Sequence, residues 1–393
     1  ARKMTVPTGI ILFFTLLLCH QSIAFTSVQL INNHENPTSS LSPLTATYDP
    51  VFTPPDTSTI EEVACQETAA RMKRIMVPVS ESISSSGSVG ISFVHWPADV
   101  SSDGTKTGGT TSLPIVLIHG FDSSALEYRR LGSRLAARGI DTYAVDLLGW
   151  GYTQLQGVNT FSADAKVEAL ESFAKTILNG NPFCVAGASL GGAAVIELAS
   201  RNPELCKGLI LIDAQGFVDG IGPMASLPTP LAALGVQVLK SVPLRSSANQ
   251  MSYFDKTTYA TDDAVRIGRL HCLQEGWSNA LVSFMKSGGF SPSQKVPTIE
   301  APALVLWGRQ DGILDGSEFA NKFVEELPNA RLQWIEECGH VPHLEKPDET
   351  ADAIQEFLVE IAPDTGGLNQ GALLVAAGAT AAAVAVGAAA NFF

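Results

Sequence analysis

The stretch CVAGASLGGAAVIELA (residues 184–199) joins a short apolar segment of strand character to one of helical character, with Ser189 at the junction. A sharp strand-to-helix turn strains the backbone of the turn residue, and Gly187 and Gly191 supply the room that this crowding requires. The strain holds the serine hydroxyl out at the top of a sheet, where the helix N-terminus favours developing negative charge. Ser189 is therefore a candidate nucleophile. The alternative is a glycine-rich turn with an incidental serine, which would have the same sequence pattern.

Composition limits the classes of function. The chain has 393 residues, of which 45% are hydrophobic and 16% charged, so it can bury a sizeable core. Its net charge of −14, with no basic block, argues against nucleic acid as a partner. The six cysteines form neither a C-x-x-C pair nor a metal-ligand spacing, and they fit a disulfide framework poorly. We therefore expect neither a metal nor a cofactor.

The N-terminal region has the composition of a targeting sequence. Residues 10–18 (IILFFTLLL) form an apolar run of signal-peptide length, and small residues follow, so residues 1–24 are predicted to be a signal peptide. Phe25 directly after the cut resembles the bipartite presequences of algae with complex plastids, and residues 25–74 are interpreted as a transit peptide or linker. No Lys or Arg lies between Phe25 and Arg71, so an ordinary secretory signal is the alternative.

The C-terminal region, residues 363–393, is rich in alanine. Within it, residues 372–390 carry no charge and as a helix would extend roughly 28 Å, close to the thickness of a bilayer. The segment is a candidate transmembrane helix and would give membrane association. The alternatives are a low-complexity tail and a helix that covers the domain.

Between residues 75 and 361 apolar strand-like and amphipathic helical segments alternate. Such alternation predicts an α/β fold with a mostly parallel central sheet flanked by helices, in two core parts at 75–216 and 297–362. Strands are expected at residues 89–96, 114–119, 142–147, 183–188, 209–213, 303–307 and 332–336. Helices are expected at residues 124–138, 163–178, 190–200, 316–326 and 347–361.

The alternation is interrupted at residues 217–296, which contain no clear strand and look helical. Eighty residues are too many for a loop in a compact domain unless they carry structure of their own. An inserted helical cap is the economical interpretation. Its apolar residues pack on one another, line a pocket, or do both.

A serine nucleophile needs a base within hydrogen-bond reach and an acid that orients the base. In sheet enzymes of this kind these residues follow strands in the order Ser, acid, His. Asp311 follows one predicted strand and His340 the next, 122 and 29 residues after Ser189 and Asp311 respectively. Asp213 is the rival acid, and His343 is the rival base. His340 fits better because it follows a glycine directly after its strand.

The negative oxygen of the reacting carbonyl needs two hydrogen-bond donors. The first candidate is the backbone N–H of Leu190, the residue after the nucleophile. The second is the N–H of Phe121, in the stretch LIHGFDSS, where Gly120 lets the loop lie close. His119 is interpreted as structural.

Together these motifs resemble the α/β-hydrolase superfamily over about residues 75–362. They are HGF at 119–121, DLLGWG at 146–151, GASLG at 187–191, GRQD at 308–311 and GHVPH at 339–343. The resemblance implies the α/β-hydrolase fold and the triad Ser189, Asp311 and His340. Haloalkane dehalogenases and epoxide hydrolases carry aspartate at the position of Ser189, which argues against both chemistries.

A narrower resemblance joins the chain to plant and algal plastid α/β-hydrolase-domain proteins, through HGFDSSALEYRRL, VDLLGWG, IGRLHCLQEGW and VSFMKSGGF. The chain is more distantly similar to chlorophyll dephytylases, which cut a phytyl ester. The superfamily resemblance implies a serine hydrolase of carboxylic esters or thioesters, and the narrower resemblance implies the plastid but no settled substrate. The apolar cap and the candidate membrane tail favour a small, apolar substrate of the acyl or phytyl type, and association with the thylakoid is expected. A ligand-binding receptor with an intact triad and a scaffold of a membrane complex are the alternatives. The sequence leaves the oligomeric state open.

Overall fold

The computed structural model describes residues 47–99 and 113–362. The expected signal peptide at 1–24 and the alanine-rich tail at 363–393 lie outside these residues. Within the described part of the chain, no helix combines the length and the apolar character needed to cross a membrane.

A nine-stranded sheet organises the described residues, in the order β1-β2-β3-β5-β4-β6-β7-β8-β9. Its strands are β1 (Thr47–Tyr48), β2 (Lys73–Pro78), β3 (Ser88–Trp96), β4 (Ile115–Ile118), β5 (Thr142–Val145), β6 (Phe183–Ala188), β7 (Cys206–Ile212), β8 (Ala303–Gly308) and β9 (Ala330–Ile335). The pairs from β5 through β4 to β9 are parallel, and those among β1, β2, β3 and β5 are antiparallel. The predicted mostly parallel sheet is therefore confirmed.

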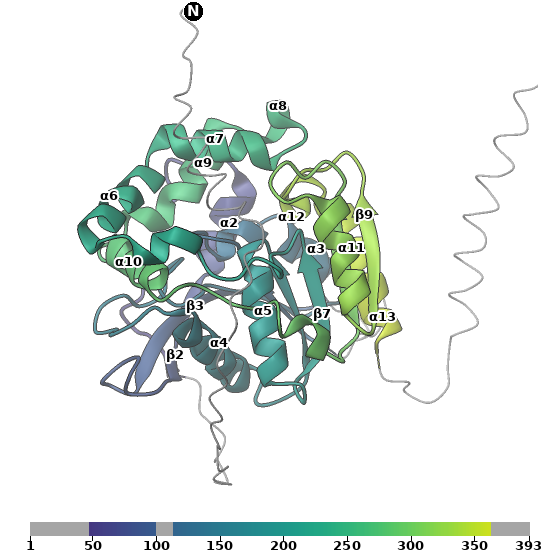
Figure 1. Ribbon diagram of the computed structural model, residues 1–393, viewed down its shortest axis with the longest axis horizontal. Helices are drawn as coiled ribbons and strands as arrows, with labels where there is room; N and C mark the ends of the chain where they lie inside the picture. The colour runs from purple at the N-terminus through teal and green to yellow at the C-terminus, as the bar shows by residue number, and fades with distance from the viewer. Residues whose placement is uncertain (1–46, 100–112, 363–393) are drawn as a thin grey trace, which may run out of the picture. The chain divides into compact units, whose positions relative to one another are not determined.

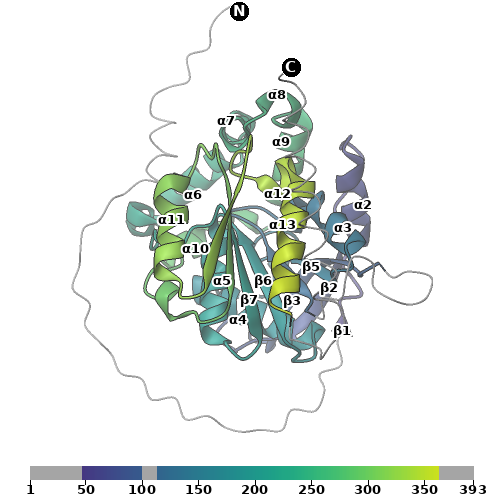
Figure 2. The ribbon, with the colours of Figure 1, turned by 90° about the vertical axis from the view of Figure 1, so that its right-hand side faces the viewer.

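Helices cover both faces of the sheet. One face carries α4 (Ala163–Ile177), α5 (Leu190–Arg201) and α11 (Gly316–Glu326), and the other carries α3 (Leu131–Ala137) and α13 (Pro347–Glu360) (Figure 2). Side chains alternate along a strand, so each parallel strand feeds two cores.

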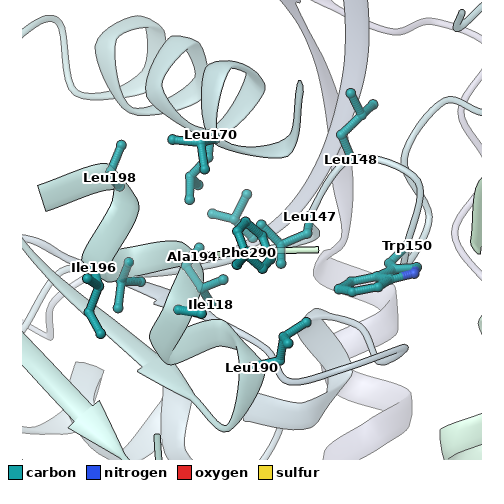
Figure 3. Close-up of a cluster of buried hydrophobic side chains, with 14 of the residues drawn as sticks. Ile118, Leu147, Leu148, Trp150, Leu170, Leu190, Ala194, Ile196, Leu198 and Phe290 are labelled. Atoms are coloured by element: carbon teal, nitrogen blue, oxygen red, sulfur yellow. The ribbon is translucent and has the colours of Figure 1, made fainter. Parts of the chain in front are cut away.

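The alternation is visible in β4. The first core lies on the face covered by α4 and α5, and it contains Val116 and Ile118. Figure 3 shows Ile118 there with Leu170 of α4 and Ala194 of α5. The second core lies on the face covered by α3 and α13, and it contains Ile115 and Leu117. A strand buried on both faces is apolar at every position, which is why β4 reads as IVLI.

The folded unit begins earlier than the expected boundary at residue 75. Helix α2 (Val63–Arg71) and strand β2 precede or span that position, and Ile60, Cys65 and Ala69 are buried in the second core. The expected linker at 25–74 is therefore wrong for its last part. The composition around residues 50–60 is rich in Pro and Thr, and it conceals the short amphipathic helix that follows.

The helix expected at 124–138 is divided into η1 (Ala125–Tyr128) and α3. At the junction, Glu62 accepts hydrogen bonds from Arg129 Nε at 2.8 Å and from Arg130 Nε at 2.6 Å. Both arginines keep right-handed helical backbone angles, so Glu62 joins the end of η1 to the start of α3.

The helical cap lies between β7 and β8, as predicted. Its helices gather at one end of the sheet (Figure 1). The cap consists of η2 (Gly222–Ser226), α6 (Thr229–Leu239), α7 (Val242–Ser252), α8 (Lys256–Tyr259), α9 (Asp262–Arg269), η3 (Leu270–Leu273) and α10 (Trp277–Lys286), with η4 (Val296–Thr298) leading back to β8.

The five cysteines of the described residues are all free and buried. They are Cys65, Cys184, Cys206, Cys272 and Cys338. The cores of the described unit are thus closed by apolar packing without a cross-link, which agrees with the disulfide-poor prediction.

Candidate active site

Ser189 occupies the turn between β6 and α5 with φ 50° and ψ −122°, a strained conformation for a residue with a side chain. The turn is tight enough to bring Gly187 and Gly191 together: a Cβ on Gly187 would lie 2.3 Å from the carbonyl oxygen of Gly191. A Cβ on Gly191 would lie 2.3 Å from the carbonyl oxygen of Ile118. The two glycines flanking Ser189 are therefore required by close backbone contacts.

Backbone hydrogen bonds fix the strained serine. Its N–H donates to the carbonyl of Ile212 at 3.0 Å, and its carbonyl accepts from the N–H of Gln215 at 2.8 Å and of Gly192 at 2.9 Å. The ends of β6 and β7 and the first turn of α5 thus hold one residue. Strain of this kind persists only where the surrounding structure over-determines the conformation.

His340 and Asp311 meet beyond the ends of β9 and β8. His340 Nδ1 lies 2.8 Å from Asp311 Oδ2, and both side chains are buried. Asp311 Oδ1 accepts from the N–H of Ile313 at 2.7 Å and of Leu314 at 3.1 Å. Burial opposes ionisation of Asp311, but His340 and these hydrogen bonds outweigh it and lower the pKa of the carboxyl. The bond at Nδ1 leaves Nε2 of His340 available to a nucleophile.

Asp213, the rival acid, lies next to this pair. Its carboxylate, that of Asp311 and the imidazole of His340 have atoms within 4.8 Å of one another. Asp213 Oδ1 accepts from the N–H of Gly308 at 3.0 Å, and burial together with the charge of Asp311 raises its pKa well above the ordinary range. The hydrogen bond to His340 belongs to Asp311.

His343, the rival base, is engaged elsewhere. Its Nε2 lies 3.0 Å from Glu127 Oε1, its side chain is fully buried, and its ring packs against that of Tyr128. Burial opposes ionisation of Glu127, but the hydrogen bond and charge of His343 lower the pKa of that carboxyl to about 2. His343 is thus the partner of Glu127.

The loop after β4 carries the expected second oxyanion donor. Gly120 and Ser189 are adjacent, since a Cβ on Gly120 would lie 3.3 Å from the Cβ of Ser189. Glu127 Oε2 accepts from the N–H of Gly120 at 3.2 Å, and His119 Nδ1 donates to the carbonyl of Gly120 at 2.9 Å. That carbonyl and the N–H of Phe121 belong to one planar peptide and point in opposite directions, so His119 also fixes the Phe121 N–H. Leu190 begins α5, so its N–H has no acceptor within the helix.

An alpha/beta hydrolase family model matches residues 115–353 of the chain, the segment that contains all of these side chains. The chain belongs to the alpha/beta hydrolase family. Membership in this family assigns the chain to the hydrolases and agrees with the resemblance found in the sequence.

Known alpha/beta hydrolases are similar to much of the chain. The alpha/beta hydrolase domain-containing protein VTE7 of Arabidopsis thaliana is 33% identical over 78% of this chain and 90% of its own length. Lipase 1 of Psychrobacter immobilis is 27% identical over 64% of this chain and 78% of its own length. A thermophilic esterase from Thermogutta terrifontis has the same fold, with a TM-score of 0.60 and 18% identity over 74% of this chain and 99% of the esterase.

The DLLGWG motif of this alpha/beta hydrolase stabilises the loops next to the site through Asp146. Buried Asp146 accepts from the N–H of Ala125 at 2.6 Å and of Tyr152 at 2.8 Å, and it also bonds the Ser92 hydroxyl. A Cβ on Gly151 would overlap the Asp146 carboxyl. The motif thus joins the loops after β4 and β5.

A cavity of about 260 Å³ opens between the catalytic core of the hydrolase and its cap. Ser189 and His340 both line it, together with Gly120, Phe121 and Leu190. Nine of its other lining residues have large apolar side chains: Leu126, Ile221, Leu239, Leu244, Val265, Ile267, Ile313, Val341 and Leu344. Leu190 also reaches the buried cluster behind the site (Figure 3). The cap therefore supplies much of an apolar wall over the serine.

Two attachments of the cap to the core were not expected from the sequence. Asp122, next to Phe121, accepts a hydrogen bond from Trp277 Nε1 at 2.8 Å and contacts Arg245 and His271. On the other side of the cavity, the N–H of His340 donates to the carbonyl of Ser252 at 2.7 Å. These partners lie far apart in the chain, so no local pattern signals them.

The described residues contain two groups of side chains of metal-ligand type. One is Asp122, His271 and Cys272, and the other is the pair of aspartates with His340. In the first group Arg245 bonds to the same Asp122 carboxylate, and its positive charge opposes binding of a cation there. In the second group, Asp311 and His340 bond to each other. Neither donor set fits a resident metal well.

Proposed function

We propose that the protein is a serine hydrolase that cleaves carboxylic esters, or thioesters, through an acyl-enzyme. One observation carries the proposal. Strained Ser189 lines the same cavity as His340, and Nδ1 of His340 bonds to Asp311, which leaves Nε2 for the serine hydroxyl. A hydroxyl is a weak nucleophile at neutral pH, and such a neighbouring base supplies the activation that it needs.

In the proposed reaction Ser189 Oγ attacks the ester carbonyl carbon, and His340 Nε2 takes the hydroxyl proton. Asp311 holds the imidazole in the correct tautomer and balances the charge of the imidazolium. The tetrahedral oxyanion accepts hydrogen bonds from the N–H groups of Phe121 and Leu190.

Breakdown of this intermediate expels the alcohol, which takes the proton from His340. Water, deprotonated by the same imidazole, then attacks the acyl-enzyme. Release of the carboxylic acid regenerates the Ser189 hydroxyl and neutral His340.

The substrate proposed for this site is apolar, of the acyl-lipid or phytyl-ester type. The support is the apolar lining that α6, α7 and α9 contribute above the serine. The name of the Psychrobacter immobilis relative, Lipase 1, points to the same class of bond.

The plastid, at the thylakoid, is the proposed compartment. The support is the N-terminal sequence, with its apolar run and following Phe25, together with similarity to a protein of Arabidopsis thaliana. Fractionation of plastid membranes from cells expressing the full chain or a chain lacking residues 366–393 tests this location. We expect the full chain to resist an alkaline carbonate wash and the truncated chain to be released.

Labelling with a fluorophosphonate probe tests whether Ser189 is activated. The wild-type protein is expected to be labelled and to hydrolyse soluble p-nitrophenyl esters. Ser189→Ala is expected to keep its melting temperature within a few degrees and to lose at least about a thousandfold in kcat, since triad residues act as a unit. A folded Ser189→Ala protein with most of its turnover would contradict the proposal, as would a wild type that binds esters without cleaving them.

A further inference from the structure

Asp122 is a buried carboxylate in the loop that carries the Phe121 N–H. It is 1% exposed and has φ 47°, so its backbone is strained. It follows directly after the expected oxyanion donor, and it lines the same cavity. Isolated buried carboxylates are costly, so its partners must compensate for the lost hydration.

Within residues 47–99 and 113–362, the side chains that bond to the Asp122 carboxylate all come from the cap. Arg245 of α7 bonds Oδ2 and also donates from Nη1 to the Asp122 carbonyl at 3.2 Å. His271 Nε2 of η3 lies 3.1 Å from Oδ1, and Trp277 Nε1 of α10 donates to Oδ1 at 2.8 Å. Three cap elements thus converge on one residue of the core.

Electrostatics reinforce this latch, defined as Asp122 with Arg245, His271 and Trp277. Burial opposes ionisation of Asp122, but the charges of Arg245 and His271 outweigh it and lower the pKa of the carboxyl. Burial likewise disfavours the His271 cation, but the Cys272 sulfur and Asp122 raise the pKa of that imidazole to about 9. The latch is therefore ionic at neutral pH, and its charges lie where water screens them little.

The two peptides that flank Phe121 are fixed from different sides. On one side, His119 and Glu127 of the core bond to the carbonyl and the N–H of Gly120. On the other side, the described bonds to the Asp122 side chain come from the cap. With the cap displaced, Asp122 would lose all of these side-chain bonds and its strained φ would relax. The peptide between Phe121 and Asp122 joins the two residues, so relaxation at Asp122 acts on Phe121 against the hold of His119 on the Gly120 carbonyl.

We infer that Asp122 is a positioning residue that couples the seating of the cap to the orientation of the Phe121 N–H. His119 holds the peptide before Phe121 from the core, and the latch holds the residue after it, so the Phe121 N–H is fully positioned only while both are in place. This inference rests on the proposed function, because it assigns the latch a role in stabilising the transition state of ester hydrolysis.

Another attachment of the cap, distant from Phe121 in the chain, provides a matched control. Asp263 of α9 accepts from the N–H of Glu61 at 3.0 Å and of Glu62 at 2.9 Å. It joins the cap to the segment before α2 and does not line the cavity. Asp263→Asn therefore weakens the attachment of the cap without touching the loop that carries Phe121.

The test compares Asp122→Asn, Trp277→Phe and Asp263→Asn by kcat and KM for p-nitrophenyl butyrate and by melting temperature. Removing one oxyanion donor costs about 10²–10³ in kcat, so Asp122→Asn is expected to lower kcat about 100-fold with KM within about threefold. Trp277→Phe, which removes one hydrogen bond and keeps the ring, is expected to lower kcat about 3- to 10-fold. Asp263→Asn is expected to lower the melting temperature and keep kcat.

Equal losses of kcat in Asp263→Asn and in the latch variants would overturn the inference, and so would latch variants that lose only thermal stability. If Asp122→Asn does not fold, Trp277→Phe decides the question alone. Failure of the proposed function gives a different result, namely no hydrolysis by the wild type or full hydrolysis by Ser189→Ala.

Discussion

Asp213 lies beside Asp311 at the same end of the sheet, yet only Asp311 bonds to the imidazole of His340. One oxygen of Asp213 accepts from the N–H of Gly308, and the other is buried without a hydrogen-bond partner among the described residues. Adjacent buried carboxyls do not both ionise readily, and the opposite pKa shifts favour the protonated form of Asp213 and the charged form of Asp311.

Asp311→Asn is therefore expected to lower kcat by about 10⁴, because an amide favours the wrong tautomer of His340. Asp213→Asn replaces a carboxyl whose protonated form is favoured by a neutral amide, and it keeps an oxygen for the N–H of Gly308, so activity within about tenfold of wild type is expected. Initial rates with p-nitrophenyl butyrate measure both. The reverse order of damage would show that Asp213 is the acid.

His340→Ala and His343→Ala are expected to differ in kind. His340→Ala removes the proposed base and should lower kcat at least about a thousandfold, with little change in melting temperature. His343→Ala leaves the buried charge of Glu127 without its partner, so the main expected effect is a loss of about 2–4 kcal/mol of stability. Paired kinetics and thermal melts make the comparison, and an inactive but stable His343→Ala protein would reassign the base.

Gly191→Ala is expected to destabilise the fold. The new Cβ would lie 2.3 Å from the Ile118 carbonyl oxygen, and backbone atoms cannot yield as a flexible side chain does. A cost of about 1–3 kcal/mol or more follows from overpacking of this kind. Gly268→Ala is the control, since a Cβ there meets nothing within 4 Å and alanine favours a helix by about 0.5–1 kcal/mol. Urea unfolding monitored by circular dichroism should move the two midpoints in opposite directions.

The contribution of His271 to the stability of the latch has an upper pH limit. The folded pKa of His271, about 9, exceeds the ordinary value of 6.5, so protonated His271 stabilises the folded state fully below about pH 6.5. This contribution is lost as the pH rises through about 9. Asp122, Arg245 and the Cys272 sulfur surround the imidazole, and the pKa of Asp122 is lowered, so the carboxylate stays charged throughout this range.

We therefore expect the difference in melting temperature between wild type and His271→Gln to be largest near pH 6 and to shrink above pH 9. Melts at several pH values with both proteins measure it, because titrations common to the two cancel in the difference. A pH-independent difference would show that His271 is neutral in the latch.

Local patterns predict the sheet from β3 onwards because each buried strand is apolar throughout and each helix is periodic. The run Phe183–Ala188 is a clear case, since it is followed at once by Leu190 and α5. The order of motifs also brings Ser189, Asp311 and His340 to one end of the sheet, because parallel strands end on the same side. The hydrogen bonds at the junction of η1 and α3 are not encoded in that way, since Arg129 and Arg130 bond to Glu62 from a distant segment.

The latch was not predicted for a similar reason. Asp122 lies within the stretch HGFDSS and Trp277 ends the stretch IGRLHCLQEGW, and neither stretch indicates a contact with the other. The hydrogen bond between them joins residues 155 positions apart. Polar contacts across such a separation follow no periodicity, and only the packing of the cap on the core reveals them.

The free, buried thiols can be used to measure local opening of the protein, because a thiol reagent reaches each one only when the surrounding structure opens. Burial raises the pKa of the Cys184 thiol well above its ordinary range and that of Cys206 to about 12, so neither reacts while the sheet is closed. Cys272 is covered in the latch, where Arg245 bonds its sulfur. Modification of Cys272 by a thiol reagent under native conditions would thus measure how often the cap lifts, whereas modification of Cys184 would measure how often the sheet itself unfolds.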